Sequence, residues 1–239
     1  MGDRMSTINV NAIDKESGST LTLGGSGTQV ALHASATASG FGLNSVQVFT
    51  SSGTWTRPTG VTKVIIEVQG AGGGGSRSDS ANNRAISGAA GGYAKKLLDV
   101  SSISTATITV GSGGAGGTGT GTDVGAVGGN SSWADGTNTV TGAAGTTAAP
   151  ATDTWAVIPG GVASGGDINI DGAKGGPVAS EYGTADSFFG TGGGFIDLAG
   201  GYTAAGENNG MGYGSGGGGT KDAQGGAGAG GIVIVWEYK

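Results

Sequence analysis

Short stretches in which apolar and polar residues alternate recur through most of this chain. Residues 61–68, VTKVIIEV, place Val64, Ile66 and Val68 on one face and Lys63 on the other. Alternation with a period of two is typical of a β-strand that buries one face. Further strands are predicted at residues 46–50, 94–100, 106–110, 137–141, 165–171 and 231–239. Because no stretch of ten or more residues has helical periodicity, the pattern predicts an all-β fold.

The pattern of the first 45 residues differs from that of the rest of the chain. Residues 19–32, STLTLGGSGTQVAL, alternate leucine with threonine, turn at GGSG and alternate again. An isolated hairpin of this kind is marginally stable in water, whereas several chains wound together could bury its apolar positions. We therefore predict an N-terminal stalk or attachment region over residues 1–45 and a second domain over residues 46–239.

Glycine adds a second kind of structure to these strands, because it supplies 57 of the 239 residues. Each glycine in a regular element costs about 0.5 to 1 kcal/mol relative to alanine, so this content is favourable only where side chains must be absent. The main runs are residues 70–76, 111–125, 190–195, 213–219 and 225–231. Their spacing is not that of collagen, which needs glycine at every third residue. We expect packed backbone, with tracts in the threefold extended helix called polyglycine II.

Charge and cysteine content exclude several classes of partner and stabilising bond. The formal net charge is −6 and only 11 residues are Lys or Arg, which argues against a nucleic-acid partner. No stretch approaches the ~18 apolar residues of a membrane span, so we expect no membrane insertion. Cysteine is absent, so disulfides and thiolate metal sites cannot stabilise the chain. Packing, backbone hydrogen bonds or oligomerisation must do so, and we expect no cofactor.

Two motifs suggest ligand chemistry but are incomplete. The first glycine run satisfies G-x-G-x-x-G after a strand, yet no amphipathic helix follows to hold a nucleotide. Asp167, Asn169 and Asp171 match the first half of a calcium-binding loop, but the bidentate glutamate of its twelfth position is absent. The favoured alternative is a strand with Ile168 and Ile170 inward that ends in a turn.

Enzyme chemistry has little support in this sequence. His33 is the only histidine, so a Ser-His-Asp triad or a histidine metal site would have to be built around it. Glycoside hydrolysis by a pair of carboxylates stays open, because spacing along the chain does not determine spacing in space. We expect no catalytic residues and a protein that is not an enzyme.

Aromatic and amide residues between the glycine runs are candidates for recognition. Rigid rings among small polar residues are typical of binding loops, because they offer contact area at low entropic cost. The alternative is that the rings fill a sparse core. The candidate receptor-binding residues are Trp155, Tyr182, Phe188, Phe189, Tyr202, Asn208 and Asn209. Trp55, Trp133 and Trp236 are expected to fill the core.

Five segments in fixed order resemble the glycine-rich C-terminal domain of bacteriophage tail-fibre and receptor-binding proteins. They are VFTSSGTWTRPTGVTKVIIEVQGAGGGG, GGYAKKLLDVSS, TITVGSGGAGG, GGNSSW and GGAGAGGIVIVWEYK. The likeness covers roughly residues 46–239, and the segment GSTLTLGGSGTQVAL also resembles the short β repeats of phage fibre stalks. The resemblance implies a virion fibre, commonly a trimer, that displays variable loops to the host. Related adhesins stack polyglycine helices into a sandwich.

These observations together predict a structural and binding protein. We expect a homotrimer made in the host cytoplasm, in which residues 1–45 form a trimeric β stalk that contacts other phage tail proteins. Residues 46–239 would form a glycine-rich, β-sandwich-like tip that binds a host surface glycan or an outer-membrane protein. The alternatives are a tailspike-type polysaccharide depolymerase and a capsid or decoration fibre.

Overall fold

The computed structural model describes residues 42–79, 83–118, 121–147, 149–152, 157–176, 185–194, 196–197 and 208–239. All of these residues belong to one unit, Gly40–Lys239. Of the N-terminal region predicted over residues 1–45, the structure describes only residues 42–45. The described residues form strands, turns and extended segments without a helix, so the all-β prediction is confirmed. In this part of the chain no helix is long and apolar enough to cross a membrane.

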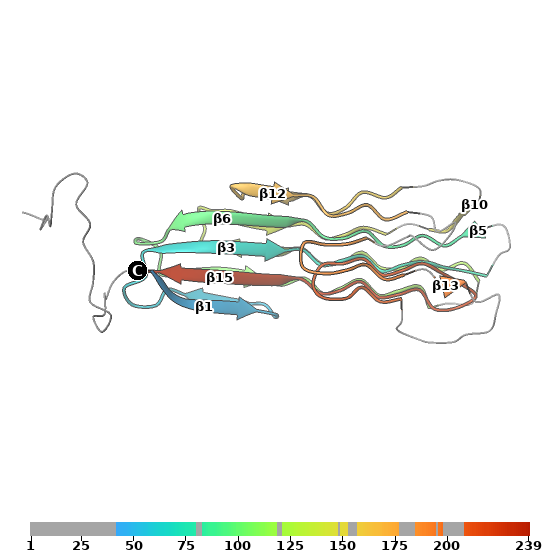
Figure 1. The fold of residues 1–239 in the computed structure, drawn as a ribbon, viewed down its shortest axis with the longest axis horizontal. Helices are drawn as coiled ribbons and strands as arrows, with labels where there is room; N and C mark the ends of the chain where they lie inside the picture. The colour runs from blue at the N-terminus through green and yellow to red at the C-terminus, as the bar shows by residue number, and fades with distance from the viewer. Residues whose placement is uncertain are drawn as a thin grey trace, which may run out of the picture. The chain divides into compact units, whose positions relative to one another are not determined.

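A five-stranded antiparallel sheet, sheet A, contains most of the longer predicted strands (Figure 1). Its order is β1 (Leu43–Phe49), β15 (Ile232–Tyr238), β3 (Lys63–Gln69), β6 (Tyr93–Asp99) and β12 (Ile168–Ile170). Each pair of neighbours is antiparallel. The strand β15 therefore lies between two strands that come much earlier in the chain.

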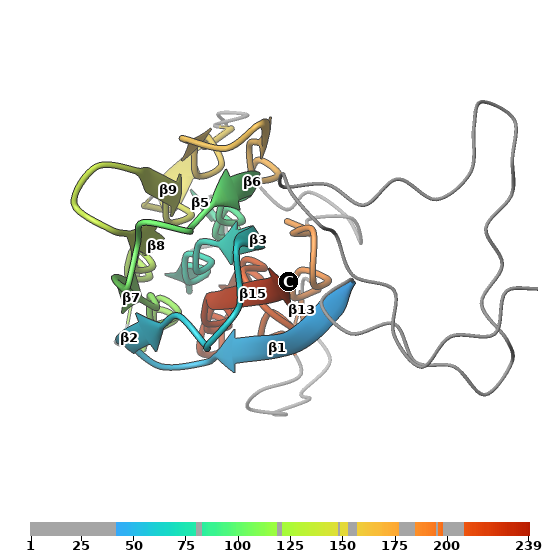
Figure 2. The ribbon, with the colours of Figure 1, turned by 90° about the vertical axis from the view of Figure 1, so that its left-hand side faces the viewer.

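A second five-stranded antiparallel sheet, sheet B, covers one face of sheet A. Its order is β11 (Ala163–Ser164), β9 (Thr139–Gly142), β8 (Ser131–Ala134), β7 (Thr105–Thr109) and β2 (Gly53–Thr56). Strands β8 and β9 contact β3, and β9 also contacts β6, so the two sheets pack face to face. Figure 2, which looks along the strands, shows the two layers.

Large side chains fill the space between the two sheets. Val64, Ile66 and Val68 are fully buried there, as their alternation predicts. The indoles of Trp55 and Trp133 are also fully buried, with ring centroids 6.0 Å apart. This is the side-chain core of the molecule, and its two tryptophans confirm their predicted place.

Trp236 is not in this core, contrary to prediction. On β15 the alternation is inverted, because Val235 and Glu237 face sheet B while Trp236 is half-buried on the outer face. Glu237 can be buried because Trp55 Nε1 and Gln47 Nε2 each donate to its Oε1 at 2.7 Å. A period of two separates the faces of a strand, but it does not say which face meets the second layer.

The isoleucines of β12 also differ from prediction. The strand forms, but Ile168 and Ile170 are 53% and 44% exposed rather than inward. Strand β12 is at the edge of sheet A and pairs only with β6, and all three of its residues are exposed.

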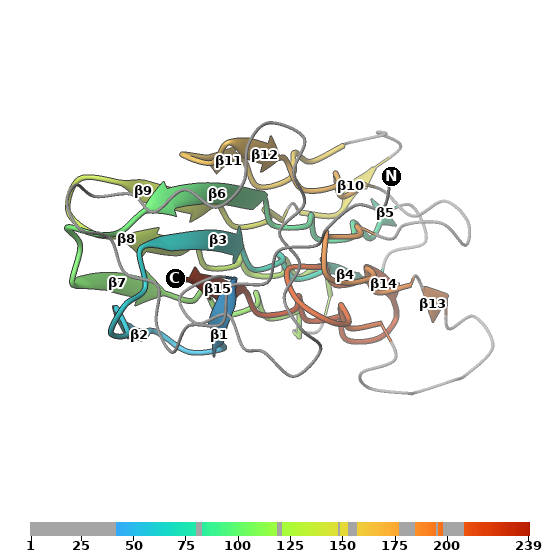
Figure 3. The same cartoon turned by 60° about the vertical axis from the view of Figure 1, so that its left-hand side comes forward.

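Two smaller sheets lie among the glycine tracts, on the far side of the tracts from the two large sheets (Figure 3). One has the parallel order β13 (Ile196–Asp197), β14 (Thr220–Lys221) and β4 (Arg77–Ser78). The other pairs β10 (Ala151–Thr152) with β5 (Asn83–Arg84). Between these small sheets and the large ones, backbone packs against backbone.

The tract 70–76, which follows β3, shows how the glycine runs are held. Its successive backbone amides donate hydrogen bonds to three neighbouring segments in a repeating order, at donor–acceptor distances of 2.8 to 3.1 Å. The bonds run from Gly70 to Gly92, Ala71 to Gly129, Gly72 to Ala229, Gly73 to Ala89, Gly74 to Ala126 and Gly75 to Gly226. Every third residue of the tract therefore donates to the same neighbour, and buried amides are satisfied without a sheet.

The interior of this region has no room for side chains at most glycine positions. A Cβ atom on Gly73 would overlap the carbonyl oxygen of Thr146, and one on Gly74 would overlap that of Ala115. Both obstacles are backbone, which cannot rotate away. Ala71 shows that a methyl group is accommodated where it points into a gap, and it is fully buried.

Candidate functional site

Three aromatic rings gather beside the outer face of sheet A and form the aromatic cluster, Tyr93, Phe188 and Phe189. The rings of Tyr93 and Phe188 stack with centroids 4.0 Å apart and an interplanar angle of 14°. Phe189 packs edge-on against both, at 5.6 Å from Tyr93 and 5.1 Å from Phe188. Phe188 and Phe189, two predicted receptor-binding residues that are neighbours in the sequence, thus both pack against a tyrosine that was not predicted for the site.

Different parts of the fold position the three rings. Tyr93 is the first residue of β6 and pairs with Gln69 of β3 and with Ile170 of β12. Phe189 forms a backbone bridge with Tyr213, so the short segment around residue 188 is attached to the glycine tracts. The stacked residues Tyr93 and Phe188 differ in exposure, because Tyr93 is 3% exposed and Phe188 is 57% exposed. The aromatic cluster therefore has a buried ring, Tyr93, and an exposed ring, Phe188.

The carboxylate of Glu67 holds Tyr93 in place through a hydrogen bond. This carboxylate accepts hydrogen bonds from Tyr93 Oη at 2.9 Å and Trp236 Nε1 at 3.0 Å, and it pairs with Lys95 Nζ at 3.0 Å. Burial alone would raise the pKa of Glu67, but these three donors outweigh burial and hold that pKa below its usual value. Burial, and then the bond to this carboxylate, raise the pKa of Tyr93. The tyrosine hydroxyl therefore stays a donor at neutral pH.

A cavity of about 280 Å³, the Phe188 pocket, opens beside the stacked rings. The residues that line it include the apolar or aromatic Tyr93, Ile170 and Phe188 and the acidic Asp171 and Asp186. Asp171 Oδ1 accepts from the amide of Ala163 at 3.1 Å, and Asp186 Oδ1 accepts from the amide of Gly192 at 2.8 Å. These bonds fix the orientation of both carboxylates.

Neither carboxylate of the Phe188 pocket is neutralised within the described part of the chain. The ion pairs there are Lys95 with Glu67 and Lys96 with Asp167. The pocket therefore combines an exposed aromatic face with two hydrogen-bond acceptors that carry negative charge.

A larger cavity of about 420 Å³ has a different character. It is lined mainly by polar side chains, among them Asp99 and Asp135. Asp135 Oδ1 accepts from the amides of Thr137 and Asn138 at 2.7 and 2.6 Å, and Asp99 Oδ1 accepts from the amide of Ser101 at 2.9 Å. Each carboxylate thus closes its own turn, and no aromatic ring faces a ligand here.

A family model described as a glycine-rich domain matches residues 47–238. The chain belongs to this family. The match begins within β1 and ends at the last residue of β15, so the glycine-rich domain contains both large sheets, the tracts and the Phe188 pocket. No curated protein matches the chain.

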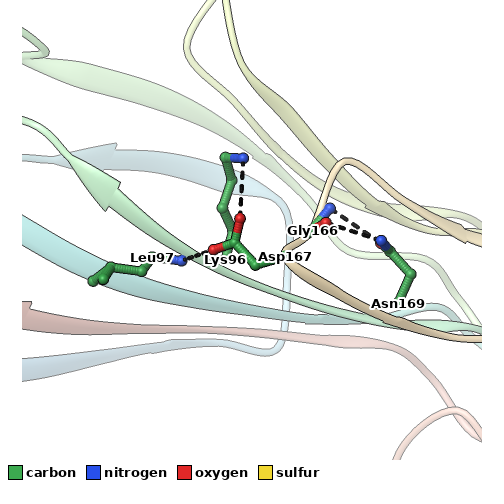
Figure 4. A network of polar contacts seen from close by, with 5 residues as sticks. All are labelled: Lys96, Leu97, Gly166, Asp167 and Asn169. Atoms are coloured by element: carbon green, nitrogen blue, oxygen red, sulfur yellow. Dashed lines mark hydrogen bonds and ion pairs between the residues drawn. The ribbon is translucent and has the colours of Figure 1, made fainter.

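The calcium candidates of the glycine-rich domain are engaged with separate partners (Figure 4). Asp167 accepts from the amide of Leu97 at 2.8 Å and lies 3.8 Å from Lys96 Nζ, while the Asn169 amide exchanges two bonds with Gly166. Asp171 lies instead at the Phe188 pocket. In the described ranges, no group of three or more His, Cys, Asp or Glu side chains is gathered to hold a metal. We therefore propose no calcium site.

The two candidate asparagines lie among the glycine tracts. Asn208 is buried, and its Nδ2 donates to the carbonyl oxygens of Gly218 and Gln224 at 3.4 and 3.1 Å. Asn209 is exposed, and its Oδ1 accepts from the amide of Ala227 at 2.7 Å. Asn208 has a structural task, so we leave it out of the proposed binding surface. Trp155, Tyr182 and Tyr202 lie outside the described residues.

Sequence reasoning did not select Tyr93 or Asp186 for the site. Phe188 is far from Tyr93 along the chain, and the two rings meet because the bridge between Phe189 and Tyr213 holds the segment around residue 188 to the glycine tracts. The one local signal was the position of Tyr93, the first large residue after a glycine run.

Proposed function

We propose that this glycine-rich domain is the host-binding part of a bacteriophage tail fibre, which acts by non-covalent adhesion. The observation that carries the proposal is the aromatic cluster, in which a backbone framework presents an exposed ring beside two carboxylates. Exposed aromatic side chains with fixed polar neighbours are the usual anchors of recognition surfaces. The resemblance of five segments to phage fibre domains supports the same function.

The framework is proposed to consist of polyglycine II helices. Support comes from the rotation of hydrogen bonds along 70–76, where every third residue has the same partner segment. A helix with three residues per turn produces this repeat. A crystal structure should give φ near −75° and ψ near +145° along the tracts. Torsions typical of β-strands would refute the proposal.

We further propose a homotrimer whose residues 1–45 form the β stalk and attach to other phage tail proteins in the virion. The outer face of sheet A supports association at its β1 edge, opposite the β12 edge beside the Phe188 pocket, because Val46 and Val48 leave apolar surface exposed there. Light scattering of the full chain should give three times 22.6 kDa. A stable monomer at micromolar concentration would refute this assembly.

The receptor is proposed to be a host surface glycan or an outer-membrane protein. Fluorescently labelled full chain should bind host cells and compete with the phage that carries this gene for adsorption. Antibodies against the domain should label the tail fibres of intact particles in electron micrographs. Label on the capsid would favour a decoration fibre, and no binding to host cells would refute adhesion.

A polysaccharide depolymerase is the second candidate. It is favoured by one observation, that Asp171 and Asp186 line the same cavity, since most glycosidases use a pair of carboxylates. Host polysaccharide incubated with the protein should release no reducing sugar if the domain only binds. Release that is abolished by Asp171→Asn or Asp186→Asn would establish the enzyme instead.

A further inference from the structure

We propose that the Phe188 pocket binds one uncharged hexopyranose unit of a host surface polysaccharide. This inference rests on the proposed function, because it takes the glycan, rather than a protein, as the receptor. It goes further by stating which sugars the site accepts and which it rejects. Three features carry it: a pre-ordered aromatic face, two acceptor carboxylates without cationic partners in the described chain, and the size of the cavity.

The exposed ring of Phe188 is suited to the apolar face of a sugar. The face of an aromatic ring is electron-rich, whereas the C–H groups on one side of a pyranose carry a small positive charge. Phe188 cannot turn freely, because Tyr93 stacks on it at 4.0 Å and Phe189 closes its edge at 5.1 Å. Tyr93 is held in turn by Glu67. A ring that is already ordered loses little entropy when a ligand stacks on it.

The two acidic residues that line the pocket determine what the other groups of the ligand must be. The carboxylates of Asp171 and Asp186 only accept hydrogen bonds, so the ligand must bring donors, as sugar hydroxyls do. A uronic acid, sialic acid or phosphorylated sugar would place a third negative charge beside them. Like charges brought together in a binding site are strongly unfavourable. The pocket therefore selects uncharged sugars against acidic ones.

The dimensions of the cavity limit the bound portion to one sugar ring. Pockets for drug-sized ligands measure roughly 300 to 1,000 Å³. The Phe188 pocket, at about 280 Å³, lies just below that range and opens to solvent. A single hexose fits, while the rest of a polysaccharide extends away on both sides. One such contact is weak, so adhesion of the whole particle would depend on many copies acting together.

The test uses the full chain on an array of immobilised glucose, mannose and galactose oligosaccharides, with oligogalacturonate as the acidic probe. Wild type should bind at least one neutral oligosaccharide and bind oligogalacturonate least. Phe188→Ala should weaken neutral binding about tenfold, since a stacked ring contributes on that scale. Asp171→Asn and Asp186→Asn should weaken neutral binding and, unlike a merely structural change, raise binding of oligogalacturonate.

Val157→Ala is the matched control, because Val157 is 60% exposed and does not line the pocket. It should bind like wild type, and thermal unfolding should show that all four variants fold. The inference is overturned if no neutral oligosaccharide binds, if Phe188→Ala binds like wild type, or if oligogalacturonate binds as tightly as the neutral probes. The proposed function fails separately, when labelled wild type does not bind host cells at all. Host-cell binding that survives Phe188→Ala would leave adhesion intact and refute the sugar site.

Discussion

The space between sheets A and B and the region of the glycine tracts are both closely packed, but for opposite reasons. Between sheets A and B, large side chains such as Trp55 and Ile66 fill the interior, and removing atoms would leave a cavity. Among the tracts, carbonyl oxygens fill the interior, and adding one carbon atom at Gly73 or Gly74 would produce an overlap. Close packing is thus reached with large side chains in one region and without side chains in the other, and the same substitution has opposite effects in the two regions.

The largest effect is expected from a cavity in the side-chain core. Trp133→Ala should lower the free energy of unfolding by about 3 to 5 kcal/mol, because the indole is fully buried between the sheets. Trp236→Ala is the control, since this indole is half-buried on the outer face. Chemical denaturation followed by circular dichroism measures both. Equal losses for the two variants would contradict the assignment of Trp133 to the core.

A smaller effect, and the sharpest contrast, is expected from adding one methyl group in each region. Gly73→Ala should lower the free energy of unfolding by roughly 1 to 3 kcal/mol, because the new Cβ overlaps the carbonyl oxygen of Thr146. Gly53→Ala in β2 has open space around its Cβ and should be neutral or stabilising by up to about 1 kcal/mol. The same denaturation experiment compares them. A Gly73→Ala variant as stable as wild type would show that the tracts are not closely packed.

The smallest effect concerns Glu67 and depends on pH. The pKa of this carboxyl is lowered in the folded state, so its ionised form adds stability above the unfolded value of about 4.3. That stability is lost as the pH falls through the lower, folded pKa. Glu67→Gln should therefore be less stable than wild type at pH 7, and the difference should shrink toward zero below about pH 4. A difference that is constant from pH 7 to pH 3 would contradict this role.

The strand content of the fold was largely predictable, because alternation is a local property. The positions of β1, β3, β6, β7 and β15 match the predicted ranges to within a few residues. Strands β2 and β8 were not predicted. Each has four residues with one tryptophan, which is too short to show alternation of apolar and polar residues. The prediction that Trp236 faces the core was wrong, because hydrogen bonds from Gln47 and Trp55 hold the neighbouring Glu237 on the inner face of β15.

The candidate site was predictable only in part, for a physical reason. The composition around Phe188 and Phe189 indicated exposed rings, and the structure places these two in one cluster. Their partner Tyr93 and the acceptor Asp186 depend on contacts between distant segments, which no local pattern encodes. Packing among the tracts was indicated by composition, but the particular glycines that cannot carry a side chain follow from which carbonyl lies opposite each one.

The position of β15 between β1 and β3 determines when sheet A can be completed during synthesis. Residue 232 leaves the ribosome 163 residues after residue 69, a delay of about 10 to 30 seconds at ordinary elongation rates. Through that interval β1 has no partner in sheet A, and an unpaired strand is prone to aggregate. Much of the chain made meanwhile is glycine and small residues, which give a nascent polypeptide little apolar surface with which to misassemble.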